Sequence, residues 1–66
     1  MNIKDFTVPE LNHFREMCNF VGVERDIFEL RSQGIPLEEI AEQVNMSVDG
    51  VKKASSRVIK KIRRCL

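Results

Sequence analysis

The sequence contains few of the residues from which enzyme and metal sites are built. Its 66 residues include one histidine, two cysteines and three glycines, and no tryptophan or tyrosine. A tetrahedral zinc site needs spaced pairs of Cys and His ligands, and a single histidine disfavours a Ser-His-Asp triad. The glycines stand apart from one another, which excludes a glycine-rich phosphate loop. We therefore expect that the protein is not an enzyme and has no cofactor or metal.

Long apolar runs are also missing. No segment approaches the roughly 20 apolar residues that span a bilayer, and the first residues contain no apolar signal-peptide region. The two cysteines, Cys18 and Cys65, do not resemble a secreted disulfide scaffold, which usually carries about four or more. We interpret both as reduced thiols and expect a cytoplasmic protein.

The charged residues that are present divide unevenly along the chain. Residues 1–51 hold four basic and ten acidic side chains, a formal charge of −6, whereas residues 52–66 hold seven basic and no acidic ones, a formal charge of +7. The formal net charge of +1 conceals this division. Such asymmetry indicates a polyanionic partner for the C-terminal segment.

Hydrophobic periodicity predicts one all-α domain over residues 1–66. The expected helices lie near residues 8–18, 23–33, 37–44 and 48–64. Thr7 and Glu10 have the spacing of a capping box, and Gly34 is the expected stop of the second helix. Asn45 suits a left-handed turn and Ser47 an N-cap, so the last two helices are joined by only three residues.

The fourth predicted helix is amphipathic and strongly basic. Its apolar face holds small and β-branched residues suited to packing, and its other face holds seven Lys and Arg side chains. Two helices joined by a tight turn, with the second basic and slim enough for a groove about 12 Å wide, are typical of a helix-turn-helix reader of duplex DNA. The expected helix-turn-helix core spans residues 37–64.

Residues 24–64 resemble the DNA-binding modules of sigma factor region four and of LuxR-type regulators. The matching stretches are Glu29-Leu30-Arg31, residues 34–42, Met46-Ser47, Val51-Lys52 and Lys61-Ile62-Arg63. Residues 1–20 look like the opening of small phage-associated or bacterial regulators. The resemblance implies that the helix beginning near Ser47 reads the major groove. The chain departs from the family where Gly50 replaces the usual threonine.

The predicted function is sequence-specific binding of double-stranded DNA by a transcriptional regulator or sigma-like factor. By resemblance, base or phosphate contacts come from the start of the fourth helix, and positioning contacts to phosphates come from its later basic residues. The predicted DNA-binding residues are Ser47, Val48, Asp49, Lys52, Lys53, Ser56, Arg57, Lys60, Lys61, Arg63 and Arg64.

Two questions stay open from the sequence. The alternative function is a protein-interaction module that binds RNA polymerase or another regulator through the acidic residues Glu38, Glu39 and Glu42. A homodimer on DNA is expected because one short recognition helix reads few base pairs. Ile59, Ile62 and Leu66 extend the apolar face, either to pair with a second subunit or to cover the first helix. A membrane-surface helix is disfavoured because this face lacks Trp and Phe.

Overall fold

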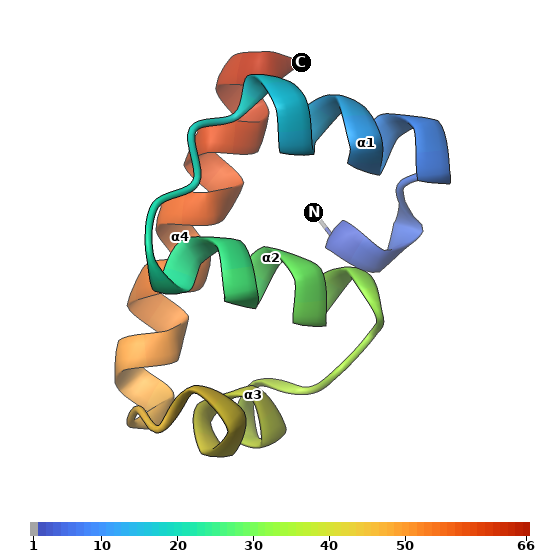
Figure 1. Cartoon of the computed structure of the whole chain (residues 1–66). Coiled ribbons are helices and arrows are strands. Elements are labelled where there is room, and N and C mark those ends of the chain that lie inside the picture. The colour runs from blue at the N-terminus through green and yellow to red at the C-terminus, as the bar shows by residue number, and fades with distance from the viewer. Residues whose placement is uncertain (1) are drawn as a thin grey trace.

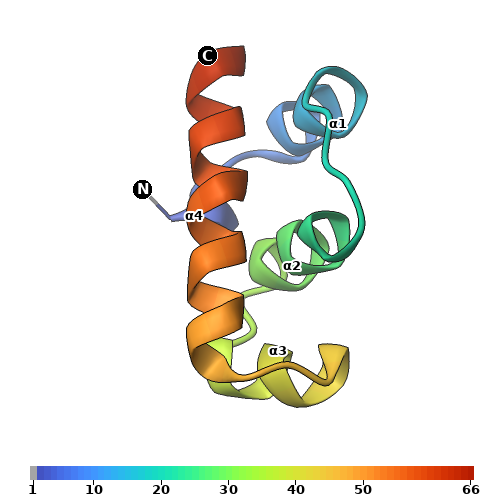
Figure 2. The same cartoon turned by 90° about the vertical axis from the view of Figure 1, so that its left-hand side faces the viewer.

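Helix α4 (Val48–Cys65) forms one long side of the molecule, and the other helices lie against it (Figures 1 and 2). The computed structural model describes residues 2–66. Within them the remaining elements are a short 3-10 helix η1 (Ile3–Asp5), α1 (Val8–Met17), α2 (Val23–Ser32) and α3 (Leu37–Val44). The predicted all-α architecture with four α-helices is confirmed for these residues. The 3-10 helix was not predicted.

The helix ends follow the local signals in the sequence. The Thr7 side chain accepts a hydrogen bond from the Glu10 amide at 3.3 Å, and the Glu10 carboxylate accepts one from the Thr7 amide at 2.7 Å, which completes the capping box. Gly34 follows α2 with φ of 81°, and its amide donates to the Arg31 carbonyl. Ser47 caps α4 by accepting from the Gly50 amide at 3.1 Å. These predicted caps are confirmed.

The core lies between α4 and the elements that pack on it. Phe14 of α1 and Phe28 of α2 are almost fully buried. Ile3 of η1 is also only 1% exposed, so the N-terminal segment contributes to the core. The largest fully buried side chains are Phe14, Phe28, Ile3, Ile27, Ile40, Ile62, Val51 and Val58. No helix within residues 2–66 has both the length and the apolar character needed to cross a membrane.

The apolar face of α4 is buried along its length. Val51, Ala54, Val58 and Ile62 have no exposed surface, and α1, α2 and α3 all contact this helix. Ile62 therefore belongs to the core of its own chain and is not available to a second subunit. Leu66 differs, because 72% of it is exposed.

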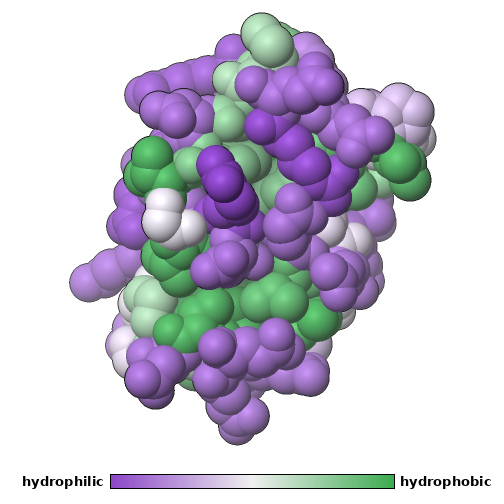
Figure 3. Space-filling model, in the orientation of Figure 1, coloured by the Kyte–Doolittle hydropathy of each residue, from purple (hydrophilic) through white to green (hydrophobic). Residues whose placement is uncertain are grey.

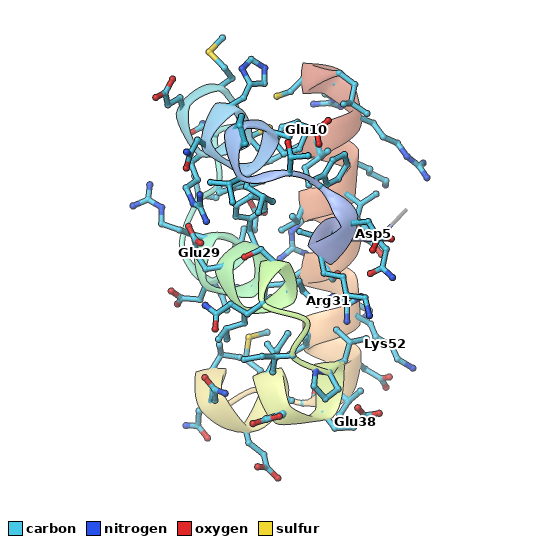
Figure 4. The ribbon with its side chains drawn as sticks, turned by 90° about the vertical axis from the view of Figure 1, so that its right-hand side faces the viewer. Asp5, Glu10, Glu29, Arg31, Glu38 and Lys52 are labelled. Carbon is cyan, nitrogen blue, oxygen red and sulfur yellow. The ribbon has the colours of Figure 1, made fainter. Side chains whose placement is uncertain are left out.

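A bidentate ion pair joins α1 to α2. The Arg15 guanidinium donates from Nε and Nη2 to the two Glu29 carboxylate oxygens, each at 2.7 Å, and Figure 4 shows Glu29 on the outer side of α2. The hydrogen bond from Arg15 lowers the pKa of Glu29. The same guanidinium lies 5.7 Å from the centre of the Phe28 ring, within cation–π range. This pair fixes the outer edge of α1 on α2.

The turn between α3 and α4 depends on two backbone requirements. Asn45 adopts the left-handed conformation, with φ of 57° and ψ of 49°, as its position predicts. Gly50 lies in the first turn of α4, where a Cβ atom would come within 3.1 Å of Met46 Cε and 3.2 Å of the Ser47 hydroxyl. A glycine at this position therefore leaves room for the cap of α4.

We expect Asn45→Ala to lower the free energy of unfolding by about 1 kcal/mol, because alanine tolerates the left-handed region poorly. Asn45→Gly is the matched control, since glycine adopts this region freely, and it should stay within about 0.5 kcal/mol of the parent protein. Urea unfolding followed by circular dichroism measures both values. Equal losses in the two variants would show that the asparagine side chain, and not the backbone conformation, matters.

Candidate nucleic-acid interface

One stripe of α4 faces solvent from its first turn to its last. Asp49, Lys53, Ser56, Lys60 and Arg63 recur at spacings of four and three residues, which places them on one helical face, and all five are exposed. Figure 2 shows α1, α2 and α3 along one side of α4, and the exposure of all five residues shows that no element within residues 2–66 covers this stripe. The stripe is therefore accessible to a large partner.

Further cations flank this stripe. Lys52 and Arg64 are exposed, and Figure 4 shows Lys52 on the same side of the molecule as Arg31 and Asp5. Five of the seven basic residues of α4 form no ion pair with any residue in the described range of 2–66. We call these five the basic surface of α4: Lys52, Lys53, Lys60, Arg63 and Arg64.

The beginning of α4 holds the other predicted contact residues, in different environments. Ser47 uses its side-chain oxygen for the helix cap, and Asp49 lies exposed in the first turn. Val48 is half-buried and packs on the core, so its side chain is largely committed to the fold. The Ser56 hydroxyl donates to the Lys52 carbonyl at 3.1 Å and keeps its oxygen lone pairs as acceptors.

Two residues that the sequence predicts as phosphate contacts, Arg57 and Lys61, form ion pairs within the chain. Both pair with Glu24, at 3.1 Å from Arg57 Nε and 2.5 Å from Lys61 Nζ. Lys61 Nζ also donates to the Asn19 carbonyl at 2.6 Å. The sequence predicts all seven cations on one face of the helix. In the structure, Arg57 and Lys61 are separated from the other five by their pairing with Glu24. They lie on the flank of α4 that meets the start of α2.

Glu24 is a buried carboxylate with complete hydrogen bonding. Only 5% of the residue is exposed, and its oxygens accept from Lys61, Arg57 and the Val21 amide. The hydrogen bond from Lys61 lowers the pKa of Glu24, with smaller contributions from Val21 and Arg57. Glu24 lies in the first turn of α2, where the helix dipole favours an acid. Its partners lie 33 and 37 residues away, so no local pattern identifies them.

An apolar groove lies between α2 and α3, away from the basic surface of α4. Its apolar lining is Val23, Leu30, Val44 and Met46, and its polar lining is Asp26, Glu29 and Gln43. Figure 3 shows hydrophobic surface as a band across the lower part of the molecule, between these helices. The predicted acidic residues Glu38, Glu39 and Glu42 are exposed on α3. The acids that line the groove itself are Asp26 and Glu29, whereas Figure 4 shows Glu38 on the same side of the molecule as Lys52.

Comparison of the chain with protein-family models, with curated proteins and with solved structures finds no match. We therefore infer the function of this site from the geometry and charge of its own residues.

We expect Glu24→Gln to lower the free energy of unfolding by about 1 to 3 kcal/mol near neutral pH, because it removes a buried acceptor of charged hydrogen bonds. The pKa of Glu24 is lowered on folding, so its contribution is complete above the ordinary glutamate pKa of about 4.3. That contribution disappears as the pH falls through the lower pKa of the folded state. The difference between variant and parent should therefore shrink in acid.

Glu39→Gln is the matched control, because Glu39 is exposed and forms no ion pair among the described residues. Its effect should stay within about 0.5 kcal/mol at every pH. Urea unfolding over a pH series measures both variants. A constant difference for Glu24→Gln across the series would contradict the ion-pair assignment.

Proposed function

We propose that the protein binds double-stranded DNA sequence-specifically, as a transcriptional regulator or sigma-like factor. In this proposal α3, the turn at residues 45–47 and α4 form a helix-turn-helix, with α4 as the recognition helix. The observation that carries the proposal is the basic surface of α4. It presents five cations on one accessible side of a single helix, and none of them pairs with an acid in residues 2–66.

The dimensions of α4 support a groove-binding role. Its 18 residues extend about 27 Å at 1.5 Å per residue, and the major groove, about 12 Å wide, admits one α-helix. The first half carries residues that suit base edges, namely Lys52, Lys53 and Ser56, because Lys donates to guanine and Ser bonds to several bases. The second half carries Lys60, Arg63 and Arg64, which suit phosphates.

Glu24 has an indirect role in this proposal. By holding Arg57 and Lys61, it fixes the flank of α4 against α2, so the basic surface faces outward. The two held cations still add to the positive potential of the helix, and Arg57 keeps 54% of its side chain exposed. We therefore assign direct phosphate contacts to the basic surface and a positioning role to Arg57 and Lys61.

Asp49 is the one acid on the exposed stripe of α4. An acid in the first turn is stabilised by the helix dipole by roughly 0.3 to 1 kcal/mol, but it repels nearby phosphates. It can accept a hydrogen bond from cytosine N4 when it faces that base. We propose that Asp49 acts mainly in helix stability.

Selection of duplexes from a random pool tests sequence specificity directly. An enriched motif supports the proposal, and an inverted repeat in that motif indicates two copies on one site. An unchanged pool after several rounds would exclude sequence-specific binding.

We expect the affinity for the selected duplex to fall with salt with a log–log slope of about −4 to −5, because each contacted phosphate contributes about −0.9. Lys60→Ala should weaken binding to all duplexes equally and reduce the slope by about one, whereas Lys52→Ala should also change the sequence preference. Fluorescence anisotropy over a salt series gives these slopes. Lys4→Ala, which removes an exposed cation of η1, is the control and should leave the slope unchanged. Binding independent of salt would exclude the proposed interface.

A second candidate function is binding of RNA polymerase or another regulator through the apolar groove and the acidic surface of α3. The observation that favours it is an apolar lining beside exposed acids, which complements a basic amphipathic helix of a partner protein. The lining of the groove includes no residue of the basic surface of α4, so the two functions do not exclude each other.

For this second function we expect purified RNA polymerase to bind the chain without DNA. Asp26→Lys should weaken that binding roughly fivefold, about 1 kcal/mol, because it places a like charge opposite a basic partner. Lys53→Ala is the control on the other surface and should bind normally. An interaction that Lys53→Ala abolishes and Asp26→Lys leaves intact would assign the contact to α4 instead.

A further inference from the structure

The two cysteines meet although 47 residues separate them. Cys18 is the C-cap that directly follows α1, and Cys65 is the last residue of α4. Their sulfur atoms are 2.6 Å apart, and both cysteines are free thiols. Figure 1 shows the ends of these two helices at the same end of the molecule. A disulfide bond of about 2.05 Å therefore requires only a small further approach of the two sulfurs.

The two thiols differ in access to solvent. Cys18 is 6% exposed, and its thiol also lies 3.6 Å from the Lys61 carbonyl. Burial raises the pKa of Cys18 to about 12, so alone it is a poor nucleophile at neutral pH. Cys65 is half-buried and lines two surface hollows, one beside His13 and one beside Met17 that Cys18 also lines. Because Cys65 is the more exposed of the two, we expect a small molecule in solution to react with it first.

We propose that Cys18 and Cys65 form a reversible redox modification site, which a low-molecular-weight disulfide such as oxidised glutathione converts to an intramolecular disulfide. The proposal stands on the sulfur contact and does not depend on DNA binding.

The chemistry is two successive thiol–disulfide exchanges. Cys65 loses its proton and attacks one sulfur of the small disulfide, whose S–S bond breaks and releases one thiol. Cys18 then loses its proton and attacks the Cys65 sulfur of this mixed disulfide, which releases the second thiol. In total, the two cysteines lose two protons and two electrons, and one molecule of small disulfide is reduced to two thiols.

Oxidation of this pair would add a covalent link between two parts of the chain that are far apart in the sequence. The disulfide closes a loop that contains α2, α3 and nearly all of α4, and it ties the last turn of α4 to α1. A cross-link over a loop of this length removes much conformational freedom from the unfolded chain. The oxidised form should therefore resist unfolding more strongly than the reduced form.

The test uses the full chain, equilibrated with mixtures of reduced and oxidised glutathione and then quenched with acid. We expect a monomer whose intact mass has lost two hydrogen atoms, and a peptide map that joins Cys18 to Cys65. The Tm of this form should rise by more than about 10 °C and return to its original value after addition of a reductant. Cys65→Ser should keep the Tm of the reduced protein in every glutathione mixture, because it retains the buried thiol and removes the accessible one.

Three results would overturn the proposal. One is a stable glutathione adduct on Cys65 with Cys18 still free, and another is a disulfide-linked dimer through Cys65. The third is retention of both thiols under the most oxidising mixture. None of these results bears on DNA binding, which is measured separately with the reduced protein, so failure of either proposal is recognisable by itself.

Discussion

Burial of one face of α4 is the constraint on which the rest of the structure depends. The face is fully buried at Val51, Ala54, Val58 and Ile62, and α1, α2 and α3 each contact the helix. None of these three is longer than ten residues, and helices this short are marginal in water without tertiary packing. Because α4 is amphipathic, burial of its apolar face also turns its cations outward. The same packing therefore stabilises the fold and creates the basic surface.

Electrostatics then divides the cations of α4 into two groups. A buried carboxylate needs charged or polar partners, and Glu24 obtains them from Arg57 and Lys61. The remaining five cations lie on the same helix without such a partner in residues 2–66. Like charges concentrated in this way repel one another, and a polyanion relieves that repulsion while releasing its counterions. These unpaired cations therefore favour a polyanion, such as the proposed DNA, over a neutral partner for α4.

Helix α1 is attached to the rest of the molecule on one side and at its C-terminal end. Its capping box is internal to residues 7–10, so the attachments to other elements are the Arg15–Glu29 pair on one side and the contact of Cys18 with the last turn of α4 at the C-terminal end. A disulfide between Cys18 and Cys65 would reinforce this second contact. A link between redox state and stability would act there, at the end of α4 remote from the α3–α4 turn.

The sequence by itself determined the four α-helices, with boundaries correct to within one residue, since these depend on residues a few positions apart; it did not predict η1. Thr7, Gly34, Asn45 and Ser47 each act on neighbours within about four residues, and the amphipathic period of the last helix is visible without a fold. The exposed basic surface followed from the same period. The charge asymmetry, the tight turn before a basic helix and the resemblance to known modules together suggested duplex DNA as the partner.

The tertiary structure decided which side chains are available. It placed Glu24 beside Arg57 and Lys61, turned Val48 towards the core, and brought Cys18 to Cys65. The pairs within this set join residues more than 30 positions apart, and the crossing of helices sets their contacts. No local period or cap encodes such a crossing, because it results from the packing of the whole core.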